Sequence, residues 1–105
     1  PSGTAVRLAE NAATALGLDY NEDVTHGREG LIGERPVREI GIHSMRGGDV
    51  IGDHTVYFVG QGERIELSHR SSTRDHYANG ALTAARFALK AEPGFYDMQD
   101  VLGLR

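Results

Sequence analysis

The sequence has no cysteine, no long apolar run and only a small net charge. Without cysteine the 105 residues carry no disulfide framework, which fits a cytoplasmic protein. No apolar run approaches the roughly 20 residues that a membrane-spanning helix needs, so we expect no membrane partner. The net charge of −4 creates no global field that attracts nucleic acid, so we expect no nucleic-acid partner.

Several motifs that mark metal or catalytic sites are also missing. No two histidines have i, i+4 spacing on a helix and no His-Glu-x-x-His occurs, so we expect no metal site. There is no Gly-x-Ser-x-Gly elbow and no Walker loop. His43, His54 and His69 fall in strand-like segments, where we interpret them as hydrogen-bonded in or beside a sheet.

The composition that remains is that of one soluble globular domain over residues 1–105. Apolar residues make up 39% and charged residues 25% of the chain, enough for one modest core. Basic residues are skewed, with ten arginines and Lys90 as the single lysine. Arginine binds carboxylate and phosphate groups with two parallel hydrogen bonds, which lysine cannot do. The genomic base composition can also produce this excess of arginine over lysine.

The first four residues, Pro1-Ser2-Gly3-Thr4, predict the start of a helix that runs to about Leu16. Gly3 has no side chain, so a ligand can approach the backbone closely. Ser2 or Thr4 can cap the helix, and the amides behind them favour an anion such as a carboxylate or phosphate. Capping alone also explains the hydroxyls. A turn of this kind at residue 1, with no initiator methionine, suggests a chain cut from a longer one.

The rest of the chain predicts a loop, a sheet and a second helix. Residues 19–36 are polar and rich in glycine, which is typical of a functional or mobile loop. Alternation or β-branched composition predicts three strands, and these cover residues 38–45, 54–59 and 64–70. Gly60-Gln61-Gly62-Glu63 predicts a hairpin turn between the last two. The second helix starts near Asp75, capped by Ser72, Thr73 or Asp75, and ends before Pro93, and an apolar tail packs back from Phe95 onward.

Two polar segments admit both a functional and a purely structural interpretation. Ser71-Ser72-Thr73-Arg74-Asp75 leads from a strand into a helix, so Arg74 can bind an anion there, or the hydroxyls simply cap the helix. Arg46-Gly47-Gly48-Asp49 precedes a strand rather than a helix, so we interpret it as a tight turn and not a phosphate cradle.

Ordered blocks along nearly the whole chain resemble the 4-hydroxy-tetrahydrodipicolinate reductase (dihydrodipicolinate reductase) family. The first block is Pro1-Ser2-Gly3-Thr4-Ala5, and a second is Arg46-Gly47-Gly48-Asp49-Val50-Ile51-Gly52-Asp53-His54-Thr55. The others are Arg28-Glu29-Gly30, Gly33-Glu34-Arg35, Gly62-Glu63-Arg64-Ile65-Glu66-Leu67-Ser68-His69, Ala78-Asn79-Gly80-Ala81 and Phe95-Tyr96-Asp97-Met98-Gln99-Asp100-Val101-Leu102.

The resemblance implies an α+β fold, a mixed β-sheet with helices packed on one face. This is the C-terminal, substrate-binding and tetramerisation domain of the family, so residues 1–105 form one such domain and assemble as a homotetramer. The family has an N-terminal Rossmann domain and a His-His-x-x-Lys run before the Pro-Ser-Gly-Thr stretch. Neither matches residues 1–105, so we expect no catalytic residue in this chain.

The implied reaction belongs to diaminopimelate and lysine biosynthesis and reduces a cyclic dicarboxylate with NADH or NADPH. By the family motif, Gly3 and Thr4 bind the substrate. Arg74 matches a loop arginine that lies near the cofactor in the family. Tyr77 occupies a position where the family often has a phenylalanine near the cofactor. Two other interpretations of the chain are a pure oligomerisation module, in which the first motif is only a helix cap, and a small anion-binding domain of unrelated function.

Overall fold

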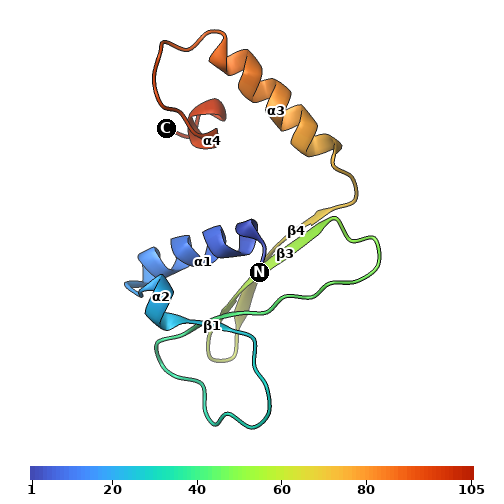
Figure 1. The fold of residues 1–105 in the computed structure, drawn as a ribbon. Coiled ribbons are helices and arrows are strands. Elements are labelled where there is room, and N and C mark those ends of the chain that lie inside the picture. The colour runs from blue at the N-terminus through green and yellow to red at the C-terminus, as the bar shows by residue number, and fades with distance from the viewer. The chain divides into compact units, whose positions relative to one another are not determined.

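The computed structural model describes all residues from Pro1 to Arg105 and confirms the α+β class. It contains helices together with one parallel and one antiparallel strand pair (Figure 1). Residues fall into two compact units, Pro1–Arg70 and Ser71–Arg105, which are described separately below. No helix is long and apolar enough to cross a membrane.

Helix α1, Gly3–Leu16, begins and ends at the residues that the sequence indicates. Ser2 is the N-cap, and Gly17 closes the helix in the left-handed conformation with φ of 67°. Ala9 and Ala13 lie one turn apart and are the buried residues of α1. These small side chains form the face of a helix that contacts strands β2 (Ile40–Ile42) and β3 (Gly52–Val59).

The segment expected to be an irregular loop opens with regular structure. Helix α2, Tyr20–Asp23, is capped by the Asp19 carboxylate, which accepts hydrogen bonds from the amides of Asn21 and Glu22. Strand β1, Val24–His26, follows and pairs in parallel with β2. The expectation of a loop over residues 19–36 is therefore wrong at its start, because a one-turn helix and a three-residue strand are too short to show a period in the sequence.

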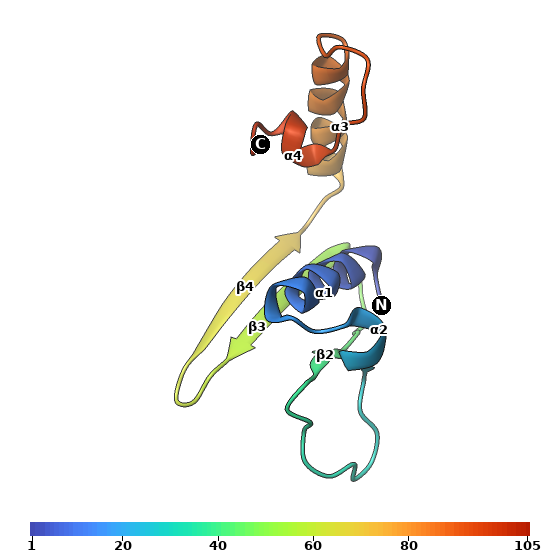
Figure 2. The ribbon, with the colours of Figure 1, turned by 90° about the vertical axis from the view of Figure 1, so that its left-hand side faces the viewer.

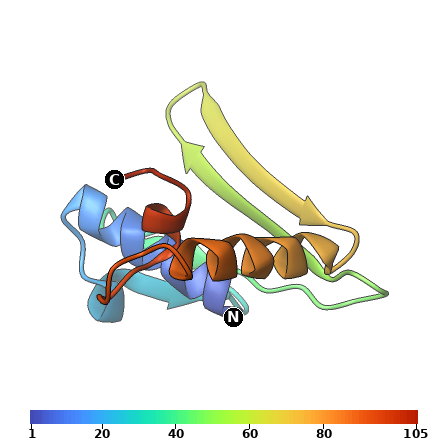
Figure 3. The same ribbon diagram turned by 90° about the horizontal axis from the view of Figure 1, so that it is seen from above.

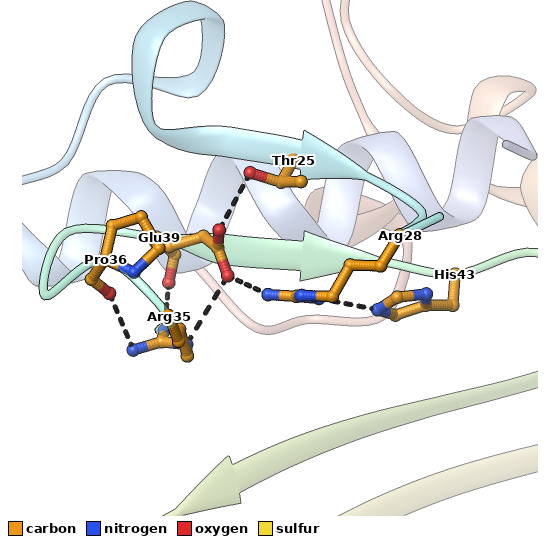
Figure 4. Close-up of polar contacts among 6 residues, drawn as sticks. All are labelled: Thr25, Arg28, Arg35, Pro36, Glu39 and His43. Atoms are coloured by element: carbon orange, nitrogen blue, oxygen red, sulfur yellow. Dashed lines mark hydrogen bonds and ion pairs between the residues drawn. The ribbon is translucent and has the colours of Figure 1, made fainter. Parts of the chain in front are cut away.

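Strand β2 is shorter than the strand expected over residues 38–45, and Ile42 is its buried residue. The connection from β1 to β2 is held by a buried carboxylate at its end (Figure 4). Glu39 is 7% exposed, accepts a hydrogen bond from Thr25 Oγ1 at 3.0 Å and pairs with both Arg28 and Arg35. Arg28 Nη1 also lies 2.9 Å from His43 Nε2. These contacts tie the glycine-rich loop to the parallel pair.

Strands β3 and β4 (Arg64–Ser71) form the expected hairpin (Figure 3). The Gly60 amide donates to the Glu63 carbonyl at 2.8 Å, and Gly62 has φ of 73°, which a side-chain-bearing residue adopts at a cost. Thr55 and Ser68 hydroxyls meet at 2.8 Å across the pair. The hairpin extends past α1, which contacts β3 near its start (Figure 2).

In the C-terminal unit, helix α3 (Asp75–Ala88) contacts the short helix α4 (Met98–Val101). The Phe87 and Tyr96 rings meet edge to face with centroids 5.2 Å apart, and the Tyr96 hydroxyl donates to the Glu92 carbonyl at 2.7 Å. The expected return of the apolar tail is thus confirmed at Tyr96. Phe95, in contrast, is 99% exposed.

Candidate functional site

The amides at the start of α1 are divided between two that are bonded and two that are open. The Ser2 side chain accepts a hydrogen bond from the Ala5 amide at 3.2 Å, and its carbonyl accepts one from the Val6 amide at 3.0 Å. The Val6 bond is the first regular bond of the helix. An α-helix leaves the N–H groups before it without intrahelical acceptors, and the Ser2 hydroxyl satisfies one of these, the Ala5 amide. The amides of Gly3 and Thr4 have no intrahelical partner.

The side chains around these two amides leave them accessible. Ser2, rather than Thr4, is the cap, so the exposed Thr4 hydroxyl has no part in closing the helix. A Cβ built on Gly3 would meet no atom within 4 Å, and its φ is not positive. Gly3 is therefore not required by backbone conformation, and its lack of a side chain opens the approach to the helix amides.

Strand β3 reaches this helix start through His54. His54 Nε2 lies 3.2 Å from Ser2 Oγ, and both residues are half-buried. A pocket of about 250 Å³ opens beside this contact. Its lining residues are Ser2, Met45, Arg46, Gly47, Val50, Ile51, Asp53 and His54. Ser2 is thus the residue of the first motif that borders the pocket.

This arrangement suits an anion such as a carboxylate or a phosphate. Two open N–H groups and a nearby hydroxyl supply donors, and the positive end of the helix dipole favours negative charge at the same place. The contribution of the dipole at an exposed helix end is about 0.3–1 kcal/mol, so the hydrogen bonds dominate. No group of three or more His, Asp or Glu side chains is arranged to hold a metal ion.

The two cofactor candidates lie in the C-terminal unit, at the start of α3. Arg74 is the N-cap of α3 by backbone position and makes no side-chain capping bond, which corrects the expected cap at Ser72, Thr73 or Asp75. Thr73 Oγ1 instead accepts from the Asp75 amide at 3.1 Å. Because the Arg74 guanidinium is exposed and joins no ion pair of the chain, it is available to a ligand.

Tyr77 is held by neighbours at the end of β4. Its hydroxyl lies 3.4 Å from Ser71 Oγ, which also contacts His76 Nε2 at 3.0 Å. The His76 and Tyr77 rings lie with centroids 3.9 Å apart. Ser71 is buried. Its contacts with His76 and Tyr77 join the end of β4 to the start of α3, and Arg74 lies in the connection between them.

The sequence did not single out the contact between His54 and Ser2. The sequence predicted only that His54 is hydrogen-bonded in or beside the sheet, and its contact with Ser2 confirms this. The partner could not be found from spacing, because 52 residues separate the two positions. The one available signal was that Ser2 and His54 both lie in blocks of the family resemblance.

Comparison with known proteins gives the family. Residues 1–102 match the model of the family described as dihydrodipicolinate reductase, C-terminus. The chain belongs to this family. It is 58% identical over all 105 residues to the 4-hydroxy-tetrahydrodipicolinate reductases of Citrifermentans bemidjiense and Geobacter sulfurreducens, and 55% identical to that of Syntrophotalea carbinolica. The matched region covers 39–40% of these relatives, so the chain spans about two fifths of their length.

Membership of the dihydrodipicolinate reductase C-terminal family accounts for the blocks recognised in the sequence. The α+β structure, with a helix start at Gly3 and a hairpin at β3–β4, is consistent with such a domain.

Proposed function

We propose that this chain is the substrate-binding and oligomerisation part of an NADH- or NADPH-dependent 4-hydroxy-tetrahydrodipicolinate reductase. The reaction reduces a cyclic dicarboxylate to tetrahydrodipicolinate in the diaminopimelate and lysine pathway. The observation that carries this proposal is the 58% identity to named reductases over every residue of the chain. A cytoplasmic location is part of the proposal, in keeping with the absence of cysteine.

The open amides of Gly3 and Thr4 bind one carboxylate of the substrate. Supporting this role are the two unbonded N–H groups, the unobstructed Gly3 and the Thr4 hydroxyl that the helix cap does not use. A carboxylate has about four lone-pair sites, so it can accept all three donors together. Charge-assisted hydrogen bonds of this kind are about twice as strong as neutral ones.

Arg74 and Tyr77 contribute to the cofactor side of the site. An exposed guanidinium without a carboxylate partner fits a dinucleotide, whose phosphates match the planar fork of arginine. The Tyr77 ring offers an apolar surface, and its hydroxyl is held toward Ser71. When bound, the nicotinamide supplies the hydride. The proton donor and the larger part of the dinucleotide site belong to the remainder of the protein.

The proposal is tested by comparing the full-length protein with residues 1–105 alone. We expect the full-length protein to oxidise NADH or NADPH when given the cyclic dicarboxylate, and the 105-residue chain to show no turnover. General acid help alone is worth roughly a hundred- to ten-thousandfold in rate, and loss of cofactor binding removes the reaction altogether. Steady turnover by the 105-residue chain would refute the division of roles, and an inactive full-length protein would refute the reaction.

A pure oligomerisation module without its own ligand site is the second candidate. It is favoured by the exposed apolar residues of the β3–β4 hairpin, among them Ile65 and Leu67. Titrating the full-length protein and its Thr4→Val variant with the dicarboxylate separates the two candidates. If residues 1–105 are only an oligomerisation module, the dicarboxylate binds equally well to both full-length proteins. If the substrate site lies at the start of α1, the Thr4→Val variant binds it more weakly.

A further inference from the structure

We propose that His54 is a positioning residue for the substrate carboxylate, acting through Ser2 on the open amides of Gly3 and Thr4. This inference rests on the proposed function. It starts from the 3.2 Å contact between His54 Nε2 and Ser2 Oγ, which joins β3 to the residue directly before α1. His54 does not touch the substrate in this proposal. It fixes the part of the backbone that does.

Ser2 can satisfy His54 and the helix at the same time. A serine hydroxyl has one donor and two acceptor lone pairs. One lone pair receives the Ala5 amide at 3.2 Å, which leaves the hydroxyl hydrogen and the second lone pair for His54. Whichever tautomer the imidazole adopts, the contact can therefore be a hydrogen bond without loss of the cap.

Ser2 is held both by strand β3 and by the first turn of α1. The side chain is fixed between α1 and β3, while the Ser2 carbonyl accepts from the Val6 amide at 3.0 Å. Gly3 follows Ser2 directly and has no side chain that could anchor it. Even a Cβ at this position would meet no atom within 4 Å. His54 thus adds a restraint from the sheet to those from the helix, at the residue directly before Gly3.

Loss of this restraint should weaken substrate binding more than it weakens the fold. The cap between Ser2 and Ala5 remains when His54 is changed, so α1 keeps its start. Without the contact to His54, the open amides of Gly3 and Thr4 move with the first turn of α1. Their two N–H donors are then no longer held at fixed positions. Binding groups lose effect when their supporting shell is loose, even where every donor is still present.

The experiment compares His54→Asn with His54→Gln in the full-length enzyme. A glutamine amide nitrogen reaches the place of Nε2, whereas an asparagine amide reaches only the place of Nδ1. We expect His54→Asn to raise the substrate KM about three- to tenfold, the range that one neutral hydrogen bond supports. We expect kcat and the cofactor KM to stay unchanged, and His54→Gln to restore the substrate KM to within about twofold of wild type.

A double-mutant cycle keeps the test independent of any loss of folding at His54. Ser2→Ala removes the bond to His54 and also the bond that caps α1, so its own effect on substrate KM contains both losses. In the Ser2→Ala background His54→Asn should therefore raise the substrate KM no further. Additive effects would overturn the proposal. So would an unchanged substrate KM in His54→Asn, or equal losses in the Asn and Gln variants with a lowered melting temperature. A wild-type enzyme without turnover would instead refute the proposed function itself.

Discussion

The start of α1 separates two roles that a serine and a threonine could have shared. Ser2 is the cap, because its hydroxyl accepts from the Ala5 amide. Thr4 is one residue into the helix with its side chain exposed. A loss of function at Thr4 therefore cannot be explained by a lost cap, which makes this position a clean probe of the proposed carboxylate site.

Thr4→Val in the full-length enzyme should lower substrate affinity by roughly ten- to a hundredfold, because a hydrogen bond to a charged group is worth about 1.5–3 kcal/mol. Cofactor affinity and melting temperature should stay unchanged, since valine keeps the shape and the cap lies elsewhere. Thr14→Val is the matched control on the same helix, where the hydroxyl donates only to the Glu10 carbonyl at 3.0 Å. Equal substrate affinities in the two variants would remove Thr4 from the site.

Glu39 shows how a single buried carboxylate organises a loop that the sequence could only describe as polar and rich in glycine. Its partners come from both ends of that loop, with Arg28 and Thr25 on one side and Arg35 on the other (Figure 4). A buried carboxylate is costly unless it is paired and hydrogen-bonded. The sequence shows several acidic residues in and beside this loop, but nothing in it indicated which of them would be buried.

Glu39→Gln should lower the free energy of unfolding by about 1–3 kcal/mol, because two arginines lose their shared anion. The estimate is below the 3–5 kcal/mol typical of a fully buried pair, since Arg35 is largely exposed. Glu10→Gln is the control, as Glu10 pairs with Arg7 at the surface, where such a bond is worth about 0–1 kcal/mol. Urea unfolding of both variants decides the matter, and indistinguishable midpoints would contradict the role of Glu39.

At the scale of elements, the sequence predicted the structures that depend on local signals and missed the pairing between segments far apart in the chain. Helix α1 was predictable because Ala9, Ala13 and Gly17 mark its buried face and its end within one short window. The β3–β4 hairpin was predictable because its turn glycines lie between two strand-like runs. The parallel pairing of β1 with β2 was not, because it joins three-residue strands across an irregular connection. The candidate residues Gly3, Thr4, Arg74 and Tyr77 came from the family motif, and their roles stay predictions.

Helix α4 depends on a reciprocal cap that is sensitive to pH. The Asp97 carboxylate accepts from the amides of Gln99 and Asp100, while the Asp100 side chain accepts from the Asp97 amide. Desolvation acts to raise the pKa of Asp97, but the hydrogen bonds from Asp100 and Gln99, together with the Arg105 charge, outweigh it and leave the pKa lowered. The ionised form is thus the one that the folded helix prefers.

A lowered folded-state pKa means that the contribution of Asp97 to stability is present above the ordinary carboxyl pKa and is lost as pH falls through the lowered one. Asp97→Asn keeps a capping oxygen and removes the charge. We expect wild type to exceed this variant in unfolding free energy at neutral pH and the difference to shrink to nothing in acid. Thermal unfolding from neutral pH into the acid range measures it. A difference that is the same at every pH would show that the charge does not matter.

At the scale of the whole molecule, the β3–β4 hairpin leaves apolar surface in need of a partner. Thr55 and Ser68 meet on one face, so by alternation Val56, Phe58, Ile65 and Leu67 lie on the other. His54 shares this second face and meets the start of α1, but farther along Ile65 and Leu67 are 62% and 60% exposed. Apolar strand surface of this kind is a liability that proteins commonly cover by association.

We expect the full-length protein to self-associate through this hairpin, with four copies as the family resemblance implies. Introducing Ile65→Glu together with Leu67→Glu should shift the sedimentation profile to smaller species, because a closed symmetric assembly repeats each buried charge in every copy. Leu89→Glu is the control, since Leu89 is 87% exposed at the end of α3 and outside the hairpin. If wild type and the chain of residues 1–105 both sediment only as monomers at high concentration, the hairpin is not a self-association surface. If the double variant keeps the wild-type assembly, the copies meet through another surface.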